Sequence, residues 1–283
     1  MGEKLRKATY EEYKRTVLEL LKRIHTVCEE NNIRYTLAFG TLLGAVRHQG
    51  FIPWDDDIDI CMPREDYDRF IKSFTSSDSR YYILDSQNSK YYYNNMARAC
   101  DGAMILKLSE KENIFNLGAF VDVFLLDRWP EAEEEREQYR RDLIVALKRV
   151  RNALPWKCYR TCTFRHNVRI LLHIKERIKD HLIVGLRKRK EERDALMVKY
   201  NGQETGWRNF STSNGAHRVT WIMREEDMDR RVLMKFEDSE FYVPADYEQL
   251  LTECYGEYMT LPPVEKRVSK HHFIPYWRYK NQK

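Results

Sequence analysis

Residues 35–62 read YTLAFGTLLGAVRHQGFIPWDDDIDICM, and this stretch decides the fold. Its apolar start, Tyr35 to Phe39, predicts a buried strand, after which Gly40 and Thr41 open a short helix. The first backbone N–H groups of a helix have no partner within it, so they are suited to binding a phosphate group. We therefore expect a strand, a turn and a helix start that together hold a phosphorylated ligand.

The same stretch ends in an acidic strand. Asp57 to Ile60 alternate polar and apolar residues, and successive side chains of a strand point to opposite faces, so Asp57 and Asp59 share one face. Two such carboxylates repel each other unless a cation lies between them, and Mg²⁺ prefers one or two carboxylates together with substrate phosphates. The pattern therefore predicts a site that holds one or two Mg²⁺ ions, with Mn²⁺ as the alternative ion. The competing interpretation is an acidic turn that only keeps a strand end hydrated.

Basic and aromatic residues lie between the predicted phosphate-binding turn and the acidic strand. Arg47, His48, Gly50 and Pro53 are expected on a loop, and Trp54 directly precedes the acids. A purely solvated turn needs neither the tryptophan nor the Gly-Thr junction, which favours the metal interpretation. The candidate substrate-binding residues of this region are Gly40, Thr41, Gly44, Arg47, His48 and Trp54.

A third carboxylate lies in a later apolar run. Residues 120–126, FVDVFLL, predict a strand that carries Asp122 on one face and Val121 and Val123 on the other. An aspartate buried in such a run needs a partner. A metal shared with Asp57 and Asp59 would supply one, whereas the alternative is a hydrogen-bonded polar residue at a strand end. Arg98, on another predicted strand, either reaches a substrate phosphate or extends to solvent.

Two segments carry a resemblance to a known family. Residues 40–60, GTLLGAVRHQGFIPWDDDIDI, resemble the signature of the LicD family of nucleotidyltransferase-fold phosphocholine and phospho-alcohol transferases, which also resembles fukutin-related protein. Residues 243–272, VPADYEQLLTECYGEYMTLPPVEKRVSKHH, resemble the closing segment of that family. The resemblance implies a third metal-binding carboxylate on a neighbouring strand. Asp57, Asp59 and Asp122 are thus the expected metal ligands and catalytic residues, and Asp122 is expected to accept the proton of the acceptor hydroxyl.

The resemblance also implies a reaction. Such enzymes move a phosphorylated alcohol from a CDP-linked donor, above all CDP-choline, to a glycan or lipid-linked glycan acceptor, such as a cell-surface or teichoic-acid-type precursor. The transferred group stays open, since ethanolamine, glycerol or ribitol phosphate would suit the same residues. Two alternatives remain: a template-free nucleotidyltransferase that releases pyrophosphate, and a non-enzymatic module that binds anionic surfaces.

The middle of the chain is strongly basic. Residues 136–199 hold nineteen Lys or Arg against seven Asp or Glu, in a chain whose net charge is only +5. The pattern is helical, so the excess predicts a basic face that contacts an anionic membrane or polymer peripherally. The alternative is a helical appendage whose charges are simply solvated. Nucleic acid is not an expected partner, because no reader motif accompanies the charge.

Composition and hydropathy predict a folded globular protein with a heavily solvated surface. The chain has 283 residues, of which 42% are hydrophobic and 33% charged, and its mean hydropathy is −0.70. The charged start MGEKLRKATY lacks the apolar centre of a signal peptide, and no apolar run approaches the roughly 20 residues of a membrane-spanning helix. We therefore expect a cytoplasmic location, with the inner face of the membrane as a place of contact.

The expected fold class is α+β (mixed α/β), a nucleotidyltransferase-like mixed sheet with flanking helices and a basic helical segment. The predicted parts are a catalytic core over residues 1–130, the basic helical segment over 131–200, and a part over 201–283 that completes the catalytic domain. In the last part, Lys266 and Arg267 are expected in an exposed segment that either folds over a diphosphate or stays solvated.

Further expected elements are helices Tyr10 to Glu30, Pro63 to Phe74 and Pro244 to Tyr255, strands Tyr81 to Leu84 and Asn95 to Cys100, and a hairpin of Val232 to Phe236 with Phe241 to Val243.

Overall fold

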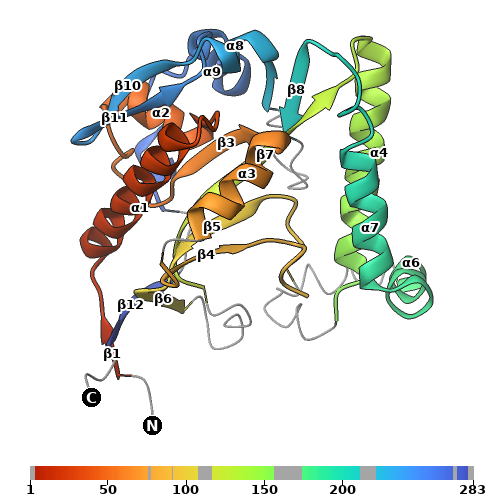
Figure 1. Ribbon diagram of the computed structural model, residues 1–283, viewed down its shortest axis with the longest axis horizontal. Coiled ribbons are helices and arrows are strands. Elements are labelled where there is room, and N and C mark those ends of the chain that lie inside the picture. Colours follow the sequence, from red (N-terminus) through yellow and green to blue (C-terminus); the bar gives the residue numbers. More distant parts are fainter. Residues whose placement is uncertain are drawn as a thin grey trace.

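A computed structural model describes residues 4–75, 78–90, 92–107, 117–155, 174–210, 221–269 and 273–279. A mixed sheet forms the centre of the molecule, and α1 and α3 lie across it (Figure 1). The helices α4 and α7 stand side by side as a separate pair at the right of Figure 1. Mixed sheets covered by helices confirm the expected α+β class.

The central sheet has the strand order β2–β3–β7–β5–β4, and β8 and β9 extend it from the end of β7. Only β3 and β7 run parallel among the neighbouring strands of the described residues; the other pairs are antiparallel. The bounds are β2 (Thr36–Leu37), β3 (Asp59–Pro63), β4 (Tyr81–Leu84), β5 (Ala97–Asp101), β7 (Ala119–Trp129), β8 (Trp207–Phe210) and β9 (Trp221–Arg224). The strands predicted around residues 81–84, 95–100 and 120–126 are therefore confirmed, and β7 is longer than expected.

Helix α1 (Tyr10–Glu30) has the predicted bounds. It begins at a capping box, in which Thr9 accepts from the Glu12 N–H at 3.1 Å while the Glu12 carboxylate accepts from the Thr9 N–H at 2.8 Å. Its apolar stripe is buried against the sheet. Helix α3 (Arg64–Thr75) begins one residue later than predicted, because Pro63 is the last residue of β3.

Helix α2 (Phe39–His48) corrects the prediction for the residues after the first strand. Arg47 and His48 form its last turn and do not lie on a loop. The helix ends at Gln49, which adopts a left-handed backbone (φ 56°) and donates its N–H to the carbonyls of Ala45 and Gly44. The first strand was expected to reach Phe39, but β2 covers only two residues. The helix therefore begins at Phe39, one residue before the expected start at Gly40.

The C-terminal part adds a hairpin, short helices and a small second sheet. The predicted hairpin is confirmed, and α9 ends as expected at Gly256 (φ 65°) but begins three residues after Pro244. The second sheet has the order β1–β12–β6 and joins the two ends of the described chain. The bounds are β1 (Lys4–Lys7), β6 (Met104–Lys107), α8 (Glu225–Asp229), β10 (Val232–Phe236), β11 (Ser239–Val243), α9 (Tyr247–Tyr255), the 3₁₀-helix η4 (Val264–Lys266) and β12 (Ile274–Tyr279).

The described parts of the basic segment, residues 131–155 and 174–200, are mainly helical, as predicted. The segment contains α4 (Glu133–Asn152), α6 (Ile174–Ile178), the π-helix η3 (Lys179–Val184) and α7 (Leu186–Met197). Several of its cations face the body of the protein. The Lys190 ammonium donates to the carbonyls of Ser86, Ser89 and Lys90 at 2.8 to 3.1 Å, and Arg193 donates to the Tyr93 carbonyl at 2.8 Å. Part of the positive charge thus fastens α7 to the loop between β4 and β5.

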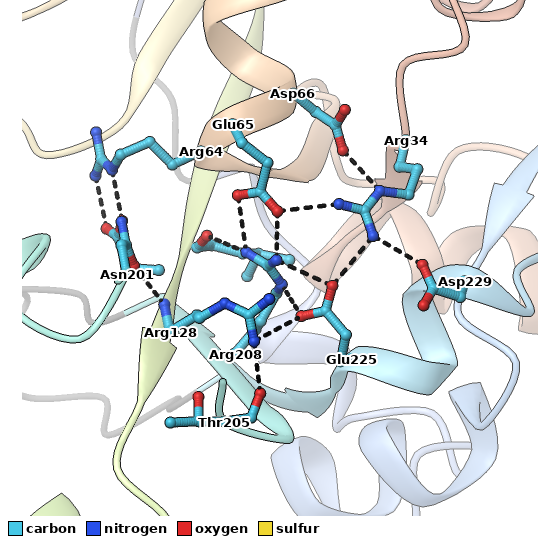
Figure 2. A network of polar contacts seen from close by, with 12 residues as sticks. Arg34, Arg64, Glu65, Asp66, Arg128, Asn201, Thr205, Arg208, Glu225 and Asp229 are labelled. Atoms are coloured by element: carbon cyan, nitrogen blue, oxygen red, sulfur yellow. Dashed lines mark hydrogen bonds and ion pairs between the residues drawn. The ribbon is translucent and has the colours of Figure 1, made fainter. Parts of the chain in front are cut away.

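A polar network joins α3, β8 and α8 (Figure 2). The Arg208 side chain is 1% exposed and lies between Glu65 and Glu225, with Nη2 2.9 Å from the Glu225 carboxylate. Arg34 pairs with Asp66 and Asp229, each at 2.7 Å. Guanidinium and carboxylate groups alternate through this network, so its buried charges compensate one another.

Across the helices that the structure describes, none has both the length and the apolar character to cross a bilayer.

Candidate active site

Three charged residues form one row across three neighbouring strands. Asp59 on β3 is the register partner of Asp122 on β7, and Asp122 is the register partner of Arg98 on β5. Register partners on adjacent strands lie about 4.8 Å apart and point to the same face of the sheet. The Arg98 Nε donates to Asp122 at 2.8 Å, and its guanidinium lies 4.0 Å from the centre of the Phe120 ring. Arg98, expected to reach a phosphate or solvent, thus contacts a predicted catalytic carboxylate.

Further carboxylates gather beside this row. Carboxylate oxygens of Asp55, Asp56 and Asp57 all lie within 4.8 Å of one another, in the loop that leads into β3. Asp59 is 9% exposed. Its burial raises its pKa well above the usual range, and the charges of Asp57, Asp122 and Asp55 raise it further. Carboxylate thus faces carboxylate at this end of the sheet.

The start of α2 lies directly against this acidic cluster. A side chain in place of Gly40 would put its Cβ 2.9 Å from an oxygen of Asp55, so the carboxylate occupies the space that a glycine leaves. The Thr41 hydroxyl is buried and accepts from the Asp59 N–H at 2.8 Å. The start of α2 and the acids are therefore adjacent, as the sequence pattern predicts, but only Asp59 lies on the strand, because β3 begins there and Asp57 belongs to the preceding loop.

A second group of predicted residues gathers around Trp54. The His48 ring lies 6.2 Å from the Trp54 ring at nearly a right angle, and the Arg267 guanidinium lies 5.6 Å from the same ring. Arg47 donates to the Tyr258 carbonyl at 2.6 Å. Burial and the charge of Arg267 both lower the pKa of Arg47, so the two guanidinium groups are close enough to repel. The end of α2 and the segment after η4 thus meet over one indole.

Two candidate residues lie apart from these groups. Gly44 is buried inside α2, where a Cβ would come within 2.5 Å of the Gly50 carbonyl oxygen, so it permits close packing of the chain. Lys266 is exposed in η4. Asp127, at the far end of β7, is the alternative candidate for the third carboxylate. It pairs with Arg64 at 2.6 Å and accepts from Asn201 at 2.7 Å.

Sequence reasoning did not identify two further residues near the acids. Ser269 donates its hydroxyl to Asp56 at 3.0 Å. Partial burial raises the pKa of the Tyr255 hydroxyl, although the residue as a whole is 38% exposed, and the charges of Asp59 and Asp55 raise it further. Both residues belong to the segment 243–272, whose resemblance to a family's closing block was the available signal.

Part of the chain matches a known protein family. Residues 32–150 match the family described as LicD/FKTN/FKRP, nucleotidyltransferase domain. This range contains the row of Asp59, Arg98 and Asp122 and the acidic cluster.

Individual relatives extend the similarity to most of the chain. The lipopolysaccharide cholinephosphotransferase LicD of Haemophilus influenzae is 27% identical over 276 residues, which cover 94% of this chain and 97% of that protein. The uncharacterized protein RP689 of Rickettsia prowazekii is 32% identical over 116 residues, 41% of each chain. The first similarity spans residues on both sides of the basic helical segment.

Proposed function

Residues 32–150 match the nucleotidyltransferase domain of the LicD family, and from that premise we propose that the chain is a metal-dependent phosphotransferase of this family. It moves a phospho-alcohol, phosphocholine in the first instance, from a CDP-activated donor to a hydroxyl of a cell-surface glycan or teichoic-acid-type precursor. The similarity to a lipopolysaccharide cholinephosphotransferase over almost the whole chain supports this reaction class. One observation carries the proposal further: Asp59 and Asp122 are register partners next to a cluster of carboxylates.

The acidic residues fit a divalent cation. Burial raises the pKa of Asp59, and so do the charges of its acidic neighbours, so the ionised form of the group is unfavourable until a cation compensates it. Hard oxygen ligands of this kind suit Mg²⁺ or Mn²⁺. We propose that Asp57, Asp59 and Asp122 hold the ion, with Asp55 close enough to join them. The ion would neutralise charge on the transferred phosphoryl group.

The cationic group around Trp54 suits the donor. Arg47 and Arg267 are close enough to repel each other, and a diphosphate between them would relieve that repulsion while it accepts their hydrogen bonds. The Trp54 ring offers a flat apolar surface beside them. We propose that these residues bind the CDP portion of the donor and orient it toward the acids. Gly40 and Thr41 would line the same path, since they contact Asp55 and the Asp59 backbone.

Asp122 is proposed to accept the proton of the acceptor hydroxyl. Arg98 holds one oxygen of this carboxylate through its Nε, which fixes the orientation of the group. The second carboxylate oxygen can then face the acceptor. Arg98 would be a positioning residue for this step, because it acts through Asp122.

The test is a panel of CDP-alcohols with Mg²⁺ and glycan acceptors. Release of CMP together with a phospho-alcohol on the acceptor would support the proposal, and chelation by EDTA should stop the reaction. Release of pyrophosphate from a nucleoside triphosphate would instead identify a template-free nucleotidyltransferase, which needs the same carboxylates. CDP-choline, CDP-ethanolamine, CDP-glycerol and CDP-ribitol in parallel would identify the transferred group.

A further inference from the structure

The basic helical segment displays large aliphatic side chains on an anchored turn. Leu182 and Ile183 in η3 are 73% and 75% exposed. Asp180, two residues before Leu182, is firmly held. It is 3% exposed, pairs with Arg189 at 2.7 Å and accepts from Asn152 at 3.1 Å. These buried contacts fix the backbone of the turn. The exposure of Leu182 and Ile183 is therefore a property of the fold.

More apolar surface lies around this turn. Ile178 on α6 is 48% exposed, and Val145 on the facing helix α4, which lines a groove together with Lys179 and Asp180, is 45% exposed. In Figure 1, α6 lies at the foot of the α4 and α7 pair. Exposed aliphatic side chains that gather at one place mark a contact with another molecule or with a membrane.

Positive charge surrounds the same place. A groove of about 430 Å³ is lined by Arg149, Lys179, Ile183, Val184, Lys188, Arg189 and Glu192. Arg149, Lys179 and Lys188 are exposed, and within the described part of the chain no ion pair engages them. By contrast, Arg189 pairs with Asp180 and Glu192. The cations of the groove are thus available to an external anion.

We propose that this surface, the basic foot (Arg149, Lys179, Leu182, Ile183 and Lys188), docks on an anionic lipid bilayer. The cations would contact lipid phosphates, and the two aliphatic side chains would enter the boundary between head groups and acyl chains. Charge complementarity selects this occupant. A second copy of the chain would bring like charges together, whereas an anionic bilayer matches both the charges and the apolar tip.

Docking of this kind would bring the enzyme to a lipid-linked acceptor, a consequence that rests on the proposed function. The docking itself does not rest on it, because vesicle binding is measured without donor or acceptor. Loss of vesicle binding with intact CMP release, or the reverse, would separate the failure of one proposal from that of the other.

The experiment measures co-sedimentation of the full chain with vesicles. We expect binding to vesicles of phosphatidylglycerol and phosphatidylcholine in equal parts, much weaker binding to phosphatidylcholine alone, and weakening with salt, since the Debye length falls from about 10 Å at 0.1 M to about 3 Å at 1 M. Combined Arg149→Glu, Lys179→Glu and Lys188→Glu should weaken binding by about 100-fold or more. Combined Leu182→Ser and Ile183→Ser should weaken it by roughly tenfold or more.

A matched control lies on the β10–β11 hairpin, at the other end of the molecule in Figure 1. Leu233 is 49% exposed there and Lys235 is also exposed, so combined Leu233→Ser and Lys235→Glu should bind vesicles as the parent does. Ile183→Trp keeps the apolar tip and should show a blue shift of its fluorescence on anionic vesicles. The proposal is overturned by a parent chain that ignores anionic vesicles, by basic-foot variants that bind unchanged, or by no such blue shift. A dimer that dissociates in the Leu182→Ser and Ile183→Ser variant would overturn it in favour of self-association.

Discussion

Two groups of acids in this protein are organised in opposite ways. In the network of Figure 2, the carboxylates of Glu65 and Glu225 face the guanidinium of Arg208. In the acidic cluster, the oxygens of Asp55, Asp56 and Asp57 lie within 4.8 Å of one another, and neighbouring acids raise the pKa of Asp59. Matched charges hold elements together, whereas carboxylates that repel each other leave a demand for an external cation. The difference separates the acids of the network from Asp59 and its acidic neighbours, whereas Asp122, which Arg98 pairs with, is a candidate because it is the register partner of Asp59.

The largest effect is expected for Asp57→Asn or Asp59→Asn. Turnover should fall by about 10⁴-fold or more, because the proposed cation loses a ligand and the phosphoryl group its charge compensation. Thermal melting in EDTA should show an unchanged or higher transition temperature, since the substitution removes a charge from a group of repelling carboxylates. Glu225→Gln in the network is the matched control, which should lose stability and keep turnover. Near-parent activity of both aspartate variants would remove them from the site.

Asp122→Asn should separate proton transfer from donor binding. Turnover should fall by about 10²- to 10⁴-fold, the usual cost of losing a general base, while donor affinity stays within a few-fold of the parent. Single-turnover kinetics with donor titration measure both quantities. Asp127→Asn is the control, because Asp127 lies on the same strand, is equally buried and also pairs with an arginine, but lies outside the row of Asp59, Asp122 and Arg98. If donor affinity falls together with turnover, Asp122 is a metal ligand without a role in proton transfer.

Arg208→Met tests the polar network of Figure 2. Removal of the guanidinium leaves Glu65 and Glu225 to share Arg34 with two aspartates, so that one cation faces four carboxylates, which should lower the free energy of unfolding by about 3 kcal/mol. Urea unfolding measures this loss. Adding Glu65→Gln and Glu225→Gln should restore much of it, because the uncompensated charges then disappear. A triple variant as unstable as Arg208→Met would mean that packing, and not charge matching, dominates at this position.

The smallest effect is expected at the cationic group around Trp54. Arg267→Ala should raise the KM for the CDP-linked donor by roughly tenfold and leave kcat nearly unchanged, as for a residue that binds the donor equally in the ground and transition states. Lys266→Ala is its natural control, since the neighbouring lysine is exposed. An equal effect of both variants would show that only general positive charge matters there.

Local patterns in the sequence were sufficient to predict many elements of this fold. The stripe of α1 and the apolar run of β7 follow directly from side-chain periodicity, and the capping residue Thr9 lies where the helix begins. The end of α2 was mispredicted because Gln49 adopts a left-handed conformation that glycine or asparagine usually occupies. Arg47 and His48 therefore moved from a loop to a helix.

Contacts between distant segments were less accessible. The ion pair of Arg98 with Asp122 depends on the register between β5 and β7, which side-chain alternation alone does not determine. The inward position of Lys190 depends on three backbone carbonyls. Every residue has a backbone carbonyl, so the sequence does not indicate which ones accept a hydrogen bond. Charge counting therefore identified a basic segment but could not divide its cations into those that fasten α7 and those that form the basic foot.

The pairing of β1 with β12 has a consequence for the order of events during protein synthesis. Arg6 on β1 donates to the Tyr279 hydroxyl on β12, 273 positions later in the chain, and Ser269 reaches the acidic loop at Asp56. A ribosome delivers the first strand long before its partner, so the small sheet can form only when translation of these residues is finished. A nascent or prematurely terminated chain would lack both the strand partner and the segment that covers the acids. Catalytic competence would thus arise late, after the rest of the domain has folded.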